Sequence, residues 1–249
     1  MFLRPINIDK NSFVSDIVSQ DYRTANVFRK YDIDFCCGGK WALGLICEMN
    51  GLNFDSIKKE LENSVRTIQL SNSLRFDQWS TDFLTEYLVN VHHQYLREAL
   101  PEIREHLNHF VEGHVEKYPH LTEILKQFNY ISKDILPHLQ QEEEILFPYI
   151  RQISHAYESK ESYASLLVRT LRKPVEDVMH HEHDIVSKVL KHLRELTNDY
   201  TPPEDACVSH RVAFSMLKEL DNDLVQHIYL ENNILFPKAV AMEKELLRR

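Results

Sequence analysis

The chain has 249 residues, 43% of them hydrophobic and 27% charged, which excludes an intrinsically disordered protein and allows one large domain or a medium and a small one. A formal net charge of −9 argues against nucleic acid or an anionic membrane surface as a partner. No apolar stretch approaches the roughly 20 residues of a membrane span, and the start lacks a signal peptide's apolar region, so we expect a cytoplasmic protein.

The amino-terminal region predicts a small separate domain of short helices. Four of the five glycines fall within one short stretch of it, at Gly38, Gly39, Gly44 and Gly51. Turn formers separate short helical patterns there, and the polar residues 69–77 suit a linker to the rest of the chain. We therefore expect a helical domain over residues 1–68, with helices near 12–20, 22–33, 41–50 and 54–63.

The four cysteines are expected to be reduced thiols, because a chain with no export signal does not suit a disulfide framework. Cys36 and Cys37 are adjacent, so they cannot easily bind one metal together or form an unstrained disulfide. The glycine-rich turn that follows them could lower a thiol pKa, which favours a redox-active or iron-relaying pair. The alternative is a tight turn with two small side chains. Cys47 and Cys207 are interpreted as structural.

Residues 78–249 predict an antiparallel four-helix bundle. This region contains one glycine, Gly113, and is rich in Leu, Glu, Lys and Gln, so it reads as nearly all helix. Turn formers and prolines divide it into four long tracts near residues 114–120, 155–162 and 197–205. Four long helices with short connections favour the bundle.

One motif occurs twice in the bundle: HLQQEEEILFP begins at His138, and HIYLENNILFP begins at His227. In each copy the histidine and a glutamate four residues later share one helix face, on an apolar stripe. A buried carboxylate is costly unless it is paired, protonated or bound to a metal. The alternative is a pair of polar helix surfaces with a repeated Leu-Phe-Pro by chance or duplication. The two stripes run through Ile131, Ile135, His138, Glu142, Ile145 and Tyr149, and through Leu217, Leu220, Leu224, His227, Glu231 and Ile234.

The repeat interval locates further ligands in the other two helices. It is 89 residues (227 − 138), and the third helix offers His183 on its apolar face, whereas His180 and His181 point away. Subtracting 89 from 183 gives 94, beside His93, although periodicity alone does not separate His93 from His92. The predicted metal ligands are His93, His138, Glu142, His183, His227 and Glu231.

This ligand set predicts a two-metal centre with an open position. If both carboxylates bridge, each metal receives two nitrogens and two oxygens, and one solvent-derived bridge leaves a vacancy on octahedral iron. Oxygen or nitric oxide could enter there. Imidazole with carboxylate and no thiolate suits iron or manganese and leaves zinc possible.

At these residues the chain resembles the repair of iron centres family, which are hemerythrin-like di-iron proteins implicated in restoring iron-sulfur clusters. The resemblance spans essentially the whole chain: the two His-x-x-x-Glu motifs, Glu182-His183-Asp184, HHQYLREALPEI and the amino-terminal IDFCCGGKWAL. It implies the same six ligands, with His93 rather than His92, around two non-haem iron ions bridged by an oxo or hydroxo group and carboxylates. A second family histidine is replaced by Leu96.

The expected function is repair of iron-sulfur clusters damaged by nitrosative or oxidative stress, by donation of iron. Its partners would be damaged iron-sulfur proteins, with nitric oxide or oxygen as small ligands, and the resemblance implies a homodimer. The alternatives are an enzyme that reduces nitric oxide to nitrous oxide and a sensor or carrier that binds nitric oxide or oxygen reversibly. Two adjacent irons could hold two nitric oxide molecules at the separation that coupling requires.

Overall fold

The structure is a computed structural model that describes residues 7–35, 41–65, 74–171 and 175–248, without the side chains of 171–181. Within these ranges the chain is helical and forms no β-strand, which confirms the expected all-α class. The turn that holds Cys36 and Cys37 lies outside the described residues. No described helix is both long and apolar enough to cross a membrane.

The amino-terminal helices form where the sequence places them and share one apolar core. Asn53 caps the last of them, because its side chain accepts a hydrogen bond from the Ser56 N–H at 2.9 Å. Gly44 donates its N–H to the Lys10 carbonyl at 2.9 Å, and a Cβ at this position would lie 2.9 Å from that oxygen, so only glycine fits. The helices are α1 (Val14–Gln20), α2 (Thr24–Lys30), α3 (Leu43–Met49) and α4 (Phe54–Ser64).

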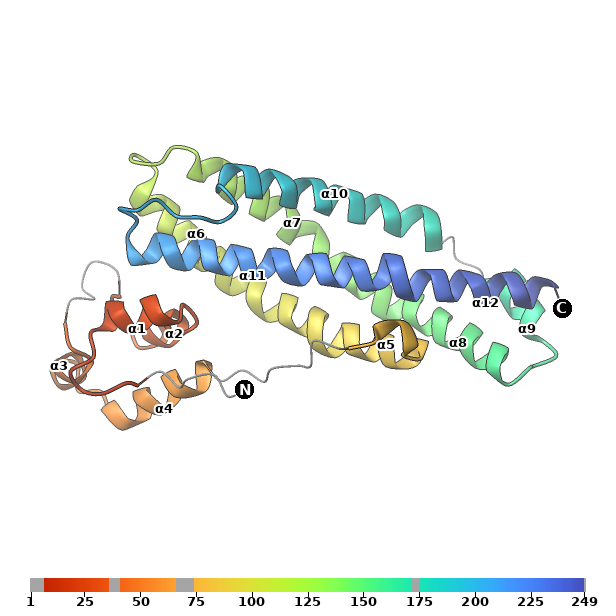
Figure 1. Ribbon diagram of the computed structural model, residues 1–249, viewed down its shortest axis with the longest axis horizontal. Helices are drawn as coiled ribbons and strands as arrows, with labels where there is room; N and C mark the ends of the chain where they lie inside the picture. Colours follow the sequence, from red (N-terminus) through yellow and green to blue (C-terminus); the bar gives the residue numbers. More distant parts are fainter. Residues whose placement is uncertain (1–6, 36–40, 66–73, 172–174, 249) are drawn as a thin grey trace.

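The rest of the chain builds the antiparallel four-helix bundle, in which α5, α8 and α12 continue the bundle helices towards one end (Figure 1). The third predicted tract is two helices, the first ending at Leu171 and the second beginning at Val175. The elements are η1 (Phe76–Gln78), α5 (Thr81–Tyr87), η2 (Leu88–His93), α6 (Gln94–His114), α7 (Leu121–Gln141), η3 (Glu142–Leu146), α8 (Phe147–Glu158), α9 (Ala164–Leu171), α10 (Val175–Leu196), α11 (Val208–Leu230), η4 (Glu231–Leu235) and α12 (Phe236–Arg248).

Three short π-helices, η2, η3 and η4, interrupt the bundle helices. In η3 the Phe147 N–H bonds the carbonyl of Glu142, five residues back, and in η4 Phe236 bonds Glu231 in the same way. The extra residue shifts the helix face by one position. The predicted stripe residue Ile145 is therefore 44% exposed, and its neighbour Leu146 is buried in its place.

The apolar core has two parts that meet at the π-helices. One cluster joins the amino-terminal helices to the bundle and includes Leu139 and Leu224. The other includes Leu146 and Leu235, the last residues of η3 and η4, and fills the end formed by α5, α8, α9 and α12. Any polar group at the junction is therefore enclosed by apolar packing on both sides along the bundle.

The amino-terminal helices dock on the first of these parts, at the end of the bundle opposite α8 and α12 (Figure 1). Asn26 donates to the Glu102 carboxylate at 2.7 Å, and the Phe35 ring stacks on His106 of α6 with 6.1 Å between centroids. His106 is 13 residues along the chain from His93 (106 − 93 = 13), or about 20 Å at 1.5 Å per residue. The proposed boundaries at 68 and 77 remain predictions, because most of the linker lies outside the described residues.

Candidate metal centre

All six predicted ligands meet at the junction between the two core clusters. Their donor atoms form two groups of four, and within each group the atoms lie within 4.8 Å of one another. Both groups contain Glu142 and Glu231, which therefore stand between two positions. All six side chains are buried, and His138, at 6%, is the most exposed. The first group is completed by His93 and His227, and the second by His138 and His183.

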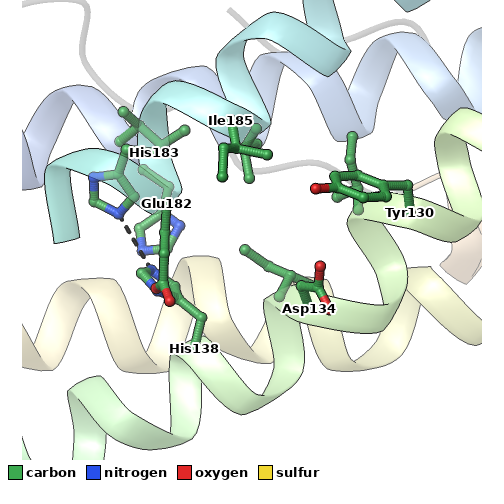
Figure 2. Close-up of a pocket in the computed structure, with 11 residues that line it drawn as sticks. Tyr130, Asp134, His138, Glu182, His183 and Ile185 are labelled. Carbon is green, nitrogen blue, oxygen red and sulfur yellow. Dashed lines mark hydrogen bonds and ion pairs between the residues drawn. The ribbon is translucent and has the colours of Figure 1, made fainter. Parts of the chain in front are cut away.

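The spacing of the donor atoms fits coordination around shared ions. Two ligand atoms about 2.1 Å from one ion and at right angles lie about 3 Å apart. The Nε2 atoms of His93 and His227 are 3.2 Å apart, as are those of His138 and His183 (Figure 2). Each motif histidine places Nε2 3.1 Å from a carboxylate oxygen of its own glutamate.

The two carboxylates carry the strongest sign of a cation. Among the described residues, none of the four oxygens of Glu142 and Glu231 has a hydrogen-bond partner, although both side chains are fully buried. Buried oxygens without donors are costly, and metal coordination removes that cost. The residues thus fit the metal that the hemerythrin-like resemblance implies.

Three of the four histidines are oriented from behind by an acceptor. The Nδ1 atom of His93 bonds Glu143 at 2.6 Å, that of His138 bonds Glu182 at 2.5 Å, and that of His183 bonds the Asn232 amide oxygen at 2.9 Å. Because these oxygens only accept, Nδ1 carries the proton and Nε2 presents its lone pair to the centre. This is the tautomer that a metal ligand needs.

The same contacts explain the rest of the repeated motif. Glu143 and Asn232, which bond His93 and His183, each follow the motif glutamate. The motif phenylalanines stack on these two histidines. The ring centroids of Phe147 and His93 are 5.6 Å apart, and those of Phe236 and His183 are 6.2 Å apart. Each copy therefore supplies two ligands and also positions a histidine of another helix. The sequence reasoning missed these roles, although the repetition of Phe at one spacing was the signal.

Burial sets the charge of the carboxylates in the metal-free centre. Loss of hydration raises the pKa of Glu231 to about 7. Burial and the nearby Glu231 charge also raise the pKa of Glu142. Burial acts in the opposite direction on His138, but its contact with Glu142 prevails and raises the His138 pKa to about 9. A metal ion would displace this proton on binding.

The other three histidines are neutral at pH 7, the form that binds metals. Burial, together with the neighbouring His227 and Arg97 side chains, lowers the pKa of His93 to about 2. Burial also lowers the pKa values of His183 and His227 to about 4.

A cavity of about 230 Å³ opens beside the centre, between α7, α10 and α11 (Figure 2). Its inner end is formed by His138, His183 and His227. The walls are largely aliphatic, and Tyr130, Asp134 and Glu182 complete the lining. Small, weakly polar molecules could therefore reach the histidines from this side.

The residues outside the two groups have other contacts. His92 is buried, bonds Asp223 through Nδ1 at 2.8 Å and stacks on His227, so it contributes to neither group. Cys47 is buried in the amino-terminal core, and the Cys207 sulfur lies 3.3 Å from His114 Nε2. Neither contributes to the centre. The candidate relay cysteines Cys36 and Cys37 lie outside the described residues.

Comparison with known proteins agrees with this geometry. Residues 85–239 match the hemerythrin HHE cation binding domain, and residues 10–65 match ScdA_N, a domain of unknown function. The chain is 34% identical to the iron-sulfur cluster repair protein YtfE of Cronobacter sakazakii over 89% of this chain and 93% of that protein. It is 32% identical to the protein of the same name in Enterobacter sp. strain 638, over 92% and 97%.

Proposed function

The chain belongs to the hemerythrin-like family of iron-sulfur cluster repair proteins, and from that premise we propose that it restores damaged clusters by donating iron held at the His/Glu centre. The observation that carries the proposal is the pair of four-ligand groups that share two buried carboxylates. Such a centre would hold two cations, and its six ligands are imidazole and carboxylate groups with no thiolate. We place this activity in the cytoplasm, where damaged iron-sulfur enzymes occur.

Two iron ions are the proposed cargo. His93 and His227 would hold one, His138 and His183 the other, and Glu142 and Glu231 would bridge them. Iron accepts this mixture of imidazole and carboxylate. Metal analysis and a visible spectrum of the purified protein test the stoichiometry, since a bridged iron pair absorbs in a way that zinc cannot.

The amino-terminal domain is proposed to assist transfer to a damaged iron-sulfur protein. Phe35, directly before Cys36 and Cys37, is about 20 Å along α6 from the centre. A relay from this end of α6 would need movement of the domain or a second chain, and we propose a homodimer.

The direct test uses a dehydratase that has lost iron from its cluster. Incubation with the iron-loaded protein should restore dehydratase activity, and His227→Leu, taken through the same loading step, should not. Free ferrous iron at the same concentration is the control. Recovery with free iron but none with the loaded protein would refute donation.

The aliphatic cavity also supports a second candidate, reduction of nitric oxide to nitrous oxide. Two ions that share bridging carboxylates could hold two nitric oxide molecules close together, and the cavity gives a small molecule a path to the histidines. The reaction consumes one electron and one proton for each nitric oxide and releases water together with nitrous oxide, so it needs an external electron donor. Nitrous oxide released over several turnovers in the presence of an added reductant would establish this reaction. A spectral change that reverses when nitric oxide is removed, without nitrous oxide, would instead indicate a sensor.

A further inference from the structure

We propose that the two metal positions are unequal, and that Glu182 is the positioning residue that retains an exchangeable ion at the position formed by His138 and His183. The proposal rests on the proposed function and states which of the two ions leaves first. Three observations support it: the cavity is lined by both histidines of only one of the two positions, the Nδ1 atoms of the histidines have different partners, and Glu182 has no equivalent in the other half of the repeat.

Access favours one position. Both histidines of the second group, His138 and His183, line the cavity, whereas only His227 of the first group reaches it. His93 is fully buried and does not line it. An ion between His138 and His183 therefore has a path to solvent, and an ion beside His93 is enclosed by packed side chains.

Glu182 links this path to the centre. Its side chain is 43% exposed and lines the cavity, and its carboxylate accepts the Nδ1 proton of His138 at 2.5 Å. A carboxylate behind a ligating imidazole raises the ligand's basicity and fixes its ring, and its loss typically weakens metal binding 10- to 100-fold. A solvent-facing residue thus controls a buried ligand.

The other half of the repeat lacks this device. Glu182 directly precedes His183, and the residue that directly precedes His93 is His92. His92 stacks on His227 with 5.8 Å between centroids and bonds Asp223 instead. Among the described residues, Nδ1 of His227 has no hydrogen-bond partner. The two motif histidines therefore differ: Glu182 accepts the Nδ1 proton of His138, and no described residue does so for His227.

At the enclosed position, which His93 and His227 form, a different carboxylate contacts a ligating histidine from behind. Glu143, behind His93, also receives two hydrogen bonds from Arg97, at 2.8 and 2.9 Å. Glu143 does not line the cavity. It is the matched control, because it makes the same kind of contact to the histidine of the enclosed position.

The experiment measures release of ferrous iron from the iron-loaded full-length protein under anaerobic conditions. An added chelator forms a coloured complex with each ferrous ion that leaves, and its absorbance is followed over time. Wild type should release one ion quickly and one slowly. Glu182→Gln, which keeps size and an acceptor oxygen, should accelerate the fast phase about 10- to 100-fold and leave the slow phase unchanged. Glu143→Gln should accelerate the slow phase only. Far-UV circular dichroism of each variant checks the fold.

Several results would overturn the inequality: release in a single phase, an unchanged fast phase in Glu182→Gln, or an accelerated fast phase in Glu143→Gln. The dehydratase assay is separate. Two-phase release by a protein that restores no dehydratase would keep the inequality and refute donation. Repair by a protein that releases both ions in one phase would support donation and refute the inequality.

Discussion

Replacement of Glu231 by glutamine should destroy metal binding and yet stabilise the metal-free protein above pH 7. The side chain is fully buried, and neither of its oxygens has a hydrogen-bond partner among the described residues. Glutamine has nearly the same size but cannot ionise. The variant therefore removes a buried charge without opening a cavity.

The magnitude follows from the pKa of Glu231, which burial raises from 4.5 to about 7. Below pH 4.5 the carboxyl group is protonated in both the folded and the unfolded chain, so its ionisation does not change the free energy of unfolding. Between 4.5 and 7 the unfolded chain releases the proton first, so wild-type stability falls as pH rises. The full difference, 7 − 4.5 = 2.5 pH units, corresponds to about 3 kcal/mol. This is an upper value, because Glu231 also favours the proton on His138.

The assay is urea unfolding of the chelator-treated proteins, followed by far-UV circular dichroism at pH 8 and pH 4.5. At pH 8 the variant should be more stable by up to about 3 kcal/mol, or roughly 6 to 12 °C in Tm for a chain of this size. At pH 4.5 most of the gain should disappear. Glu144→Gln, an exposed neighbour of the other motif glutamate, should stay within about 0.5 kcal/mol of wild type. Equal stabilities of Glu231→Gln and wild type at pH 8 would show that Glu231 is hydrated in the metal-free protein.

Four further substitutions have definite expected outcomes. His227→Leu should lose bound iron, measured by elemental analysis, while retaining its helical circular dichroism, because a leucine suits the surrounding apolar stripe. Asp221→Asn should lower the unfolding free energy by about 2 kcal/mol, because the buried carboxylate accepts two hydrogen bonds from Arg194; equal urea midpoints would contradict this. Gly44→Ala should cost about 1 to 3 kcal/mol because its Cβ would meet backbone, whereas Gly113→Ala, in open space within a helix, should gain up to about 1 kcal/mol in the same unfolding assay.

The sequence was sufficient for the fold and for the placement of the six side chains because both depend on simple spacings. Scarce glycine and regular apolar stripes predicted a helical bundle, and the structure confirms it. The four-residue spacing places His138 and Glu142 on one face, and the 89-residue interval pointed to His93, which the structure brings into the same cluster. Whether these residues bind iron remains a prediction.

The details that the sequence did not predict arise from departures from the regular α-helix. The prediction placed Ile145 in the core, but the π-helix η3 turns it outward and buries Leu146. In η2 both His92 and His93 are buried, so periodicity could not have chosen between them. The roles of Glu143 and Asn232 depend on contacts between different helices, which no single helix pattern contains.

The π-helices also keep the two ends of each motif in phase. Each is equivalent to one extra residue in an α-helix, and the hydrogen bond from Phe147 to Glu142 spans that residue. In a regular α-helix one added residue rotates every later side chain by about 100°, and the wider π turn absorbs that rotation. The Phe147 ring therefore reaches His93 from a position five residues after Glu142. If the same residues formed a regular α-helix, the ring would turn away from His93, although every ligand would still be present.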